Sequence, residues 1–157
     1  MTEDEKMLVE LDTFSKTLQI NTTRGFEFID ITDHVLEVVN KARITDGFIV
    51  VYSLHTTAAV IINENEPLLI KDMEETLRRI APPNGDYGHN DFSARTVNIC
   101  DDECKNGHSH CQHLFLGTSE TIPLLEGKHR LGRWQRIFLV ELDSARPRQV
   151  VVSILGR

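Results

Sequence analysis

The sequence predicts a single α+β domain with about six or seven strands and two or three helices. The chain has 157 residues, a length typical of one domain. Apolar residues make up 40% and charged residues 26% of it, which is typical of a globular chain and argues against disorder. Stretches of strand-like periodicity alternate with apolar residues at helical spacing. We therefore expect one domain over residues 1–157, with residues 1–6 as a disordered acidic tail.

The first elements are expected to be two strands and a helix. Apolar and polar residues alternate in part over residues 7–20, and a short β-rich stretch follows at residues 26–29. From Thr32 the apolar residues recur at helical spacing instead, with Thr32 as the expected N-cap. Residues 46–47, an Asp-Gly pair, are expected to end this helix.

Two short apolar runs then surround a polar interruption. Residues 48–52 and 58–62 are short and apolar, as buried strands are, and His55, Thr56 and Thr57 lie between them. A histidine and two threonines inside a buried sheet need hydrogen-bond partners or a ligand. The interruption is therefore a candidate functional segment.

The middle of the chain predicts a second helix, a long loop and a third helix. Asn65 is the expected N-cap of the second helix, and Pro67 lies in its first turn, where the missing N–H costs nothing. Residues 84–106 show little regular pattern, and a loop of this length in a compact domain is usually functional or mobile. Residues 107–116 predict a short third helix, ended by Gly117.

The C-terminal part predicts three strands, over residues 121–125, 131–142 and 149–155. We expect the last two strands to form a hairpin through the turn at residues 143–147, which contains Ser144 and Pro147.

The charge is distributed unevenly. The net charge is −7, yet residues 128–157 carry seven Lys or Arg against two Asp or Glu. An acidic chain is unlike a general nucleic-acid binder, which has a basic face and a high pI. A basic end on an acidic body favours a small anionic ligand. The alternative is that these arginines simply point outward from the C-terminal strands.

The sequence gives no reason to expect a membrane or secretory protein. No apolar run reaches the roughly 20 residues of a membrane-spanning helix. The N-terminus is acidic, whereas a secretory signal is basic and then apolar. We therefore expect a cytoplasmic protein with neither a membrane nor a nucleic acid as partner.

The three cysteines are Cys100, Cys104 and Cys111. An odd number without a secretory signal argues against a disulfide framework and favours reduced thiols. With His108 they are a candidate Cys3His zinc site. The spacing lacks the paired C-x2-C elements of standard zinc sites, so this signal is weak.

Histidines suggest a second, non-local metal site. His55 comes from the sheet, His89 from the long loop and His110 from the third helix. Three imidazoles around Zn2+ leave a fourth position open for water or substrate, as in catalytic zinc sites. Either His110 or His113 could point inward, because residues three apart share a helix face. His34 and His129 are expected on the surface.

Carboxylates offer a third metal site. Glu64 follows a buried strand and Asp72 lies in the next helix, and together they could hold Mg2+ with waters. The alternative is that Asp72 is simply solvated and that Glu66 favours the helix N-terminus.

Two long motifs resemble a known family. The first motif begins at His55 and reads His-Thr-Thr-Ala-Ala-Val-Ile-Ile-Asn-Glu-Asn-Glu-Pro. The second extends from Ser119 to Asp143 and contains the segment Leu-Gly-Arg-Trp-Gln-Arg-Ile. Together they resemble the YjbQ-like family, whose members are commonly described as secondary thiamine-phosphate synthases. The resemblance covers roughly residues 11–156. Two departures are Arg133, where the family usually has Thr, and Ser144-Ala145, which replaces a Gly-Pro turn.

The resemblance implies a strongly curved antiparallel sheet, assembled as a homotrimer, and a set of site residues. The implied catalytic residues are His55, Glu64, His89 and His110. The implied anion-binding residues are Asn106, Ser119, Arg136, Arg146 and Arg148. The candidate metal ligands from the residue patterns, His55, His89 and His110 for zinc or Glu64 and Asp72 for magnesium, fall on positions that match the family.

The implied reaction joins hydroxymethylpyrimidine diphosphate to a thiazole phosphate and releases diphosphate. Arginines would meet the phosphate oxygens, and a divalent ion, Zn or Mg, would stabilise the departing diphosphate. Two alternatives remain open. One is a non-catalytic protein that binds a metal or an anion. The other is metal-assisted hydrolysis of a phosphorylated metabolite, with Glu64 as the base.

Overall fold

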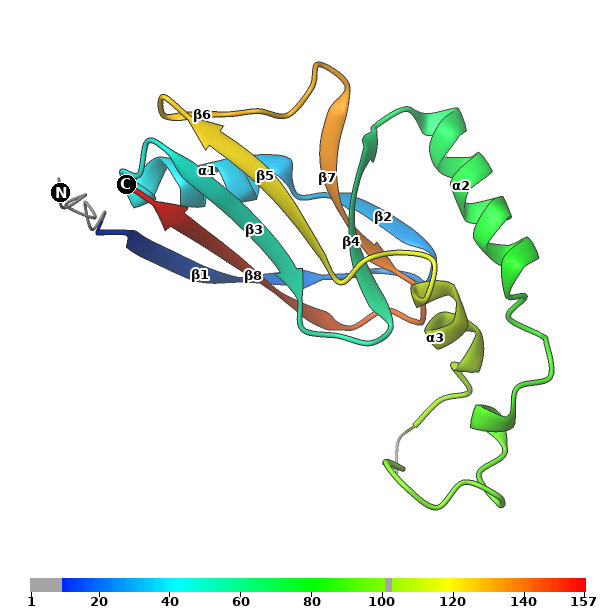
Figure 1. Ribbon diagram of the computed structural model, residues 1–157. Helices are drawn as coiled ribbons and strands as arrows, with labels where there is room; N and C mark the ends of the chain where they lie inside the picture. Colours follow the sequence, from blue (N-terminus) through cyan, green and yellow to red (C-terminus); the bar gives the residue numbers. More distant parts are fainter. Residues whose placement is uncertain (1–9, 101–102) are drawn as a thin grey trace, which may run out of the picture.

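Two antiparallel sheets curl around a shared core to form half of a barrel (Figure 1). The computed structural model describes residues 10–100 and 103–157. The larger sheet contains, in spatial order, β1 (Asp12–Asn21), β8 (Pro147–Gly156), β3 (Gly47–Ser53), β5 (Ser119–Leu125) and β6 (Lys128–His129). The smaller sheet contains β2 (Glu27–Asp30), β7 (Gln135–Glu141) and β4 (Ala58–Glu64). The predicted α+β class and the curved antiparallel sheet are confirmed.

Three α-helices complete the fold: α1 (Thr32–Ala42), α2 (Pro67–Ile80) and α3 (Gly107–His113), with a 3₁₀ turn η1 at Gly88–Asn90. None of the helices in the described part of the chain has the length and apolarity needed to cross a membrane. The expected acidic tail at residues 1–6 and the start of the strand expected from residue 7 lie outside the described residues.

The core explains the sequence patterns of the strands. Val35, Val38 and Val39 of α1 pack between the concave faces of the two sheets. The other face of the smaller sheet is also buried, because Phe138 and Val140 of β7 pack with Leu77 of α2. A strand covered on both faces reads as a continuous apolar run, as β7 does, whereas β8 alternates because one of its faces is exposed.

The prediction that the last two strands form a hairpin is wrong. β7 pairs with β2 and β4, whereas β8 pairs with β1 and β3 in the other sheet. All ten residues of β1 are matched by β8, and this long register satisfies more of the backbone than a local hairpin would. The chain between β7 and β8 therefore crosses from one sheet to the other.

Several boundaries also differ from expectation. α1 ends at Ala42 and not at residues 46–47, and α3 ends at His113 and not at residue 116. Ile31, not Thr32, is the N-cap of α1, and Asp30 Oδ1 accepts from Thr32 N–H instead (3.0 Å). Glu66, not Asn65, caps α2 by accepting from the backbone N–H groups of its first turn. The strand expected from residue 131 begins at Gln135. A side chain's capping role depends on its neighbours in space as well as on its type.

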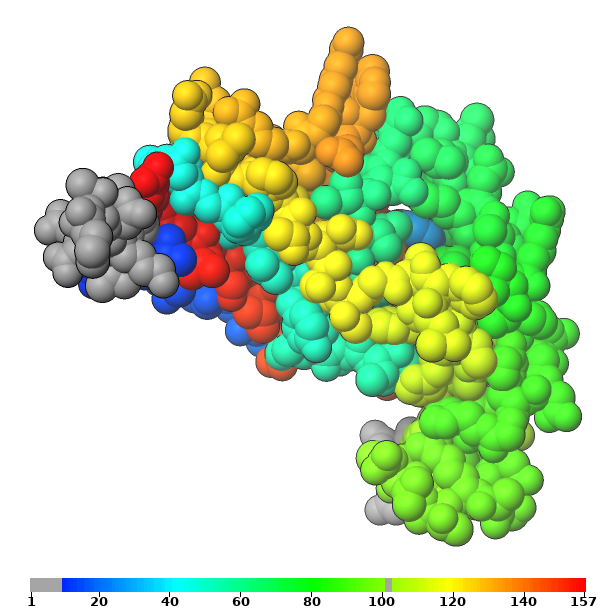
Figure 2. Space-filling model, in the orientation of Figure 1, coloured from blue at the N-terminus to red at the C-terminus, as the bar shows by residue number. Residues whose placement is uncertain are grey.

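One end of the half-barrel gathers the segments expected to be functional. The break between β3 and β4 is closed by Ser53 Oγ, which donates to Ala58 O (2.6 Å). The loop that follows α2 extends away from the body of the molecule beside α3 (Figures 1 and 2). Gly107 joins this loop to α3, since its N–H donates to Asn90 Oδ1 (2.9 Å) and a Cβ there would lie 2.6 Å from Tyr87 Cβ.

Candidate functional site

A pocket of about 550 Å³ lies where the β3–β4 break, the long loop, α3 and the start of β8 meet. It brings together most of the residues that the sequence singled out. Those residues are His55, His89, Asn106, His110, Arg146 and Arg148. We call this cavity the histidine pocket.

A buried ion pair forms the floor of the histidine pocket. The Arg148 side chain is 3% exposed and the Glu141 side chain 0% exposed. Arg148 Nε donates to Glu141 Oε2 (2.6 Å), Nη2 also pairs with this carboxylate, and Nη2 donates to Thr57 Oγ1 (3.1 Å). Glu141 accepts further from Thr22 Oγ1 (3.1 Å) and from the backbone N–H of Asp143 (3.0 Å). This buried pair is held by several hydrogen bonds, and leaving either partner alone in the interior would be costly.

Arg146 is the second arginine of the histidine pocket, and unlike Arg148 it is partly exposed to solvent. Its Nη2 donates to Asp143 Oδ2 and to Ser144 Oγ (2.6 Å each). Among the described residues, its Nε and Nη1 groups have no hydrogen-bond partner, and the side chain is 39% exposed. Carboxylates thus hold one edge of Arg146 and one edge of Arg148. The free N–H groups of Arg146 suit an incoming oxyanion.

His55 is held as a neutral imidazole in one tautomer. Its Nε2 accepts from the backbone N–H of Gln149 (2.8 Å), so Nδ1 carries the proton. Burial, and then the nearby Arg148 guanidinium, lower the pKa of His55 below its usual value. At neutral pH His55 is therefore a hydrogen-bond donor through Nδ1.

His89 and His110 form an edge-to-face pair, with ring centroids 4.6 Å apart. Burial and the neighbouring His89 lower the pKa of His110. Arg95 holds His89 in place, because its Nη1 lies 3.3 Å from His89 Nε2 and pairs with Glu103. Arg95 and Glu103 are 12% and 13% exposed, although the loop around them is exposed. Arg95 therefore organises the loop, and its cation is matched within the protein.

We expect stability to fall when the pH drops below about 6.5, the ordinary histidine value. Burial is the main cause that lowers the pKa values of His55, His108, His110 and His113. The unfolded chain then binds protons more readily than the folded one, so the free energy of unfolding rises with pH in this window. Urea denaturation at pH 7.5 and 5.5 measures the effect. A His108→Gln variant should depend less on pH, and equal midpoints at both pH values would contradict the expectation.

The zinc site is not preformed. Among the residues that the structure describes, no three His, Cys, Asp or Glu side chains converge in a geometry that could hold a metal ion. His55 Nε2 is engaged with Gln149, and His89 Nε2 lies against Arg95 and Glu103. The residues present therefore do not fit a three-imidazole zinc ion in this arrangement, although all three line one pocket.

The other predicted site residues lie elsewhere. Glu64 is at the far end of β4, which is about 20 Å long from its seven residues. Arg136 is there too, and donates to Asp30 Oδ2 (2.7 Å) and Asp33 Oδ1 (3.0 Å). Asp72 is exposed on α2, and Ser119 begins β5 outside the pocket lining. The first motif includes all of β4, so the length of this strand places Glu64 far from His55.

The Cys3His alternative is not assembled either. Cys100 and Cys104 line the histidine pocket, but Cys111 does not. His108 is buried and stacks on Phe26, with ring centroids 6.1 Å apart. His34 and His129 are exposed, as expected.

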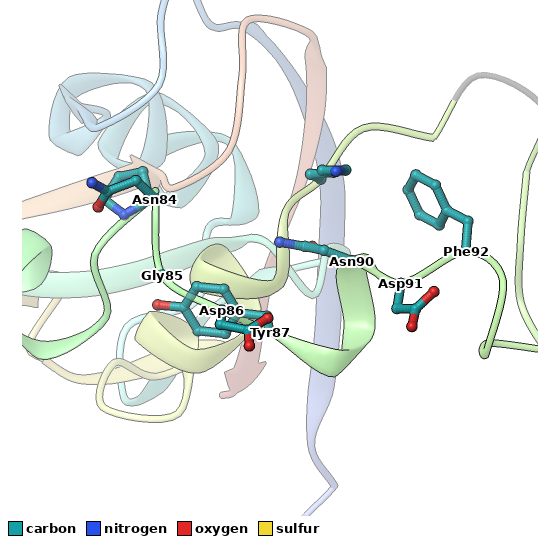
Figure 3. A pocket seen from close by; sticks show the side chains of 9 residues that line it. Asn84, Gly85, Asp86, Tyr87, Asn90, Asp91 and Phe92 are labelled. Atoms are coloured by element: carbon teal, nitrogen blue, oxygen red, sulfur yellow. The ribbon is translucent and has the colours of Figure 1, made fainter.

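A second hollow, of about 670 Å³, is lined by residues of the loop that follows α2 and by Lys105 (Figure 3). Asp86, Tyr87, Asp91 and Phe92 are among its lining residues. Tyr87 donates from its hydroxyl to Pro82 O (2.9 Å), and Asp91 accepts from the N–H of Ser93 (3.0 Å). Both side chains thus shape the loop itself.

Known proteins share both the sequence and the fold. The sequence model described as "UPF0047 protein YjbQ-like" matches residues 16–157. The chain belongs to the UPF0047 (YjbQ-like) family. A UPF0047 protein of Methanothermobacter thermautotrophicus is 37% identical over 95% of this chain and 96% of its own. YugU of Bacillus subtilis is 32% identical over 90% and 98%, respectively.

Solved structures of this family have the same architecture. A YbjQ-like protein of unknown function from Sulfolobus solfataricus P2 superposes with a TM-score of 0.85 and 34% identity, covering 94% of this chain and 100% of that one. A hypothetical protein of Aeropyrum pernix K1 gives 0.82 and 35%, covering 92% and 99%. The predicted UPF0047 membership is confirmed.

Sequence reasoning missed Arg95 and Glu103. They are eight residues apart in a loop with no regular pattern, so periodicity could not pair them. The sequence offered only one indication of their role, which is that both lie in a long loop close in sequence to several histidines.

Proposed function

We propose that the histidine pocket binds a small phosphorylated ligand and that the protein is an enzyme acting on it. One observation carries this proposal. Arg146 and Arg148 are each held on one edge by a carboxylate, and in the described part of the chain the Nε and Nη1 groups of Arg146 have no partner, in a pocket that also contains His55 and His110. Preorganised cationic donors of this kind favour oxyanions, because they need no rearrangement to bind.

The reaction proposed from the family resemblance is thiamine-phosphate synthesis. The thiazole nitrogen attacks the methylene carbon of hydroxymethylpyrimidine diphosphate, a C–N bond forms, and the C–O bond to the diphosphate breaks. Arg146 would take up the charge that develops on the leaving diphosphate. His55, as a neutral Nδ1–H donor, would add a hydrogen bond to the same group, and the pocket would hold the reactants in line.

The test is an assay with both substrates and purified protein. We expect thiamine phosphate and diphosphate in equal amounts, with turnover reduced about 10- to 100-fold or more in His55→Ala and His110→Ala, as for lost general acid–base or charged contacts. His129→Ala is the matched control, because His129 is exposed and outside the pocket. Unchanged turnover in both pocket variants would contradict the assignment.

The second candidate is a non-catalytic anion-binding protein, favoured by the same free guanidinium groups. It predicts tight diphosphate binding by calorimetry and no product in the assay above. The metal-assisted hydrolase predicts instead that phosphate is released from phosphoesters only when a divalent ion is present.

A zinc ion at the histidine pocket, or a magnesium ion at Glu64 and Asp72, stays a prediction, and zinc has its own measurement. Elemental mass spectrometry of the purified protein, beside the His110→Ala variant, would reveal about one zinc per chain that His110→Ala removes if three imidazoles rearrange around the ion. Equal zinc in both proteins would exclude His110 as a ligand.

A homotrimer and a cytoplasmic location are also proposed from the family resemblance. Sedimentation velocity tests the homotrimer.

A further inference from the structure

Cys104 lies in the wall of the histidine pocket, in contact with both Arg146 and Asp143. Its Sγ is 3.4 Å from Arg146 Nη2, and 3.4 and 3.5 Å from the two carboxylate oxygens of Asp143. Cys104 is exposed, and so is Cys100, which lines the same pocket. Two accessible thiols therefore share a cavity with the anion-binding arginines.

Asn106 gives independent reason to regard this wall as a ligand site. It lines the pocket and is only 7% exposed. Its Nδ2 donates to Asp143 Oδ2 (3.3 Å), and the carboxamide oxygen, the remaining polar atom, has no partner among residues 10–100 and 103–157. Buried polar atoms are rarely left unpaired unless a ligand or an ordered water satisfies them.

We propose that Cys104 is an S-thiolation site, modified by small disulfides, and that its modification closes the pocket to anions. Sγ attacks one sulfur of the disulfide. A new S–S bond forms, the old one breaks, and the other sulfur leaves as a thiolate. The proton that Cys104 gives up passes to solvent, and the leaving thiolate takes up a proton from solvent. Arg146 stabilises the negative charge on the attacking sulfur, as cationic neighbours of reactive cysteines do.

The consequence for the pocket rests on the proposed anion-binding function. A thiol adduct on Cys104 lies against the guanidinium that would bind the anion, so it competes for the same space. Because disulfide exchange is reversible, a reducing thiol restores the pocket. Cys111, on α3 and outside the pocket lining, provides an internal control in the same chain.

The first experiment measures site-specific modification by oxidised glutathione, using intact-mass and peptide mass spectrometry. We expect Cys104 to react about tenfold faster than Cys111, and Arg146→Gln to remove most of that difference, because Arg146 Nη2 lies 3.4 Å from the attacking sulfur. Equal rates at the two cysteines, or a Cys104 rate that does not change in Arg146→Gln, would overturn the proposal. This readout does not depend on anion binding.

The second experiment measures inorganic diphosphate binding by calorimetry before and after glutathionylation. We expect affinity to fall at least about tenfold on modification and to return with dithiothreitol, as for a blocked charged contact. Within Cys100→Ser/Cys104→Ser, treatment with oxidised glutathione should change nothing, whereas Cys100→Ser alone and Cys111→Ser should respond to it as the wild type does. Full affinity of the protein thiolated at Cys104 would overturn the gating claim. If the reduced protein binds no diphosphate, the proposed function fails, and the rate comparison still decides whether Cys104 is the modification site.

Discussion

Replacing Arg148 with alanine is expected to lower the free energy of unfolding by about 3–5 kcal/mol, the usual cost of breaking a buried ion pair. The substitution leaves the Glu141 carboxylate without exposure to water and without its guanidinium partner. The hydrogen bonds from Thr22 and the Asp143 backbone do not replace that positive charge. Urea denaturation followed by circular dichroism measures the loss.

Two comparisons separate this effect from a general loss of charge. The double variant Arg148→Met/Glu141→Met should be much less destabilised, because apolar residues of similar volume remove both buried charges together. Arg79→Ala breaks the exposed pair with Glu75 and should cost less than about 1 kcal/mol. Wild-type stability of Arg148→Ala would show that the pair contributes little to the folded state.

Replacing Arg146 with alanine is expected to weaken binding of inorganic diphosphate by about 10- to 100-fold, from the loss of charged hydrogen bonds worth about 1.5–3 kcal/mol. The guanidinium has free donors at Nε and Nη1, and its partly exposed position lets a ligand reach them. Because Arg146→Ala also leaves the Asp143 carboxylate, which is 5% exposed, without its cation, circular dichroism should first show that the variant is folded. Isothermal titration calorimetry measures the affinity.

Arg136→Ala is the matched control, because it removes the same charge from the other end of the molecule. Arg136 is already paired with Asp30 and Asp33 and lies outside the histidine pocket. Diphosphate affinity should stay within about twofold of wild type, the range of a distant screened charge. Equal losses in the two variants would show that diphosphate responds to overall charge, and would place the binding site elsewhere.

The sequence by itself determined the fold class and most of the elements. Helical spacing of apolar residues marked α1 and α2, and the apolar runs on either side of His55 marked β3 and β4. These patterns are local, because an element's own side chains show which of its faces is buried. The family motifs could also be identified from the sequence, because the residues of each motif lie close together in the chain.

Only the tertiary structure decided which strands pair. β7 and β8 are neighbours in the chain and were expected to pair, but they belong to different sheets. The apolar pattern of β8 specifies a buried face and does not specify a partner. The pairing depended on the length and register of β1, which lies about 130 residues earlier.

The candidate site, like the fold, was only partly predictable from the sequence. The sequence identified His55, His89 and His110, and the fold brings all three to one pocket with Arg146 and Arg148. It could not show that Glu64 and Arg136 lie at the opposite end of the half-barrel. A strand separates its ends by about 3.3 Å per residue, so residues in one motif can face different surfaces. Residue types set the chemistry available, and only the path of the chain through space decided which of those groups meet.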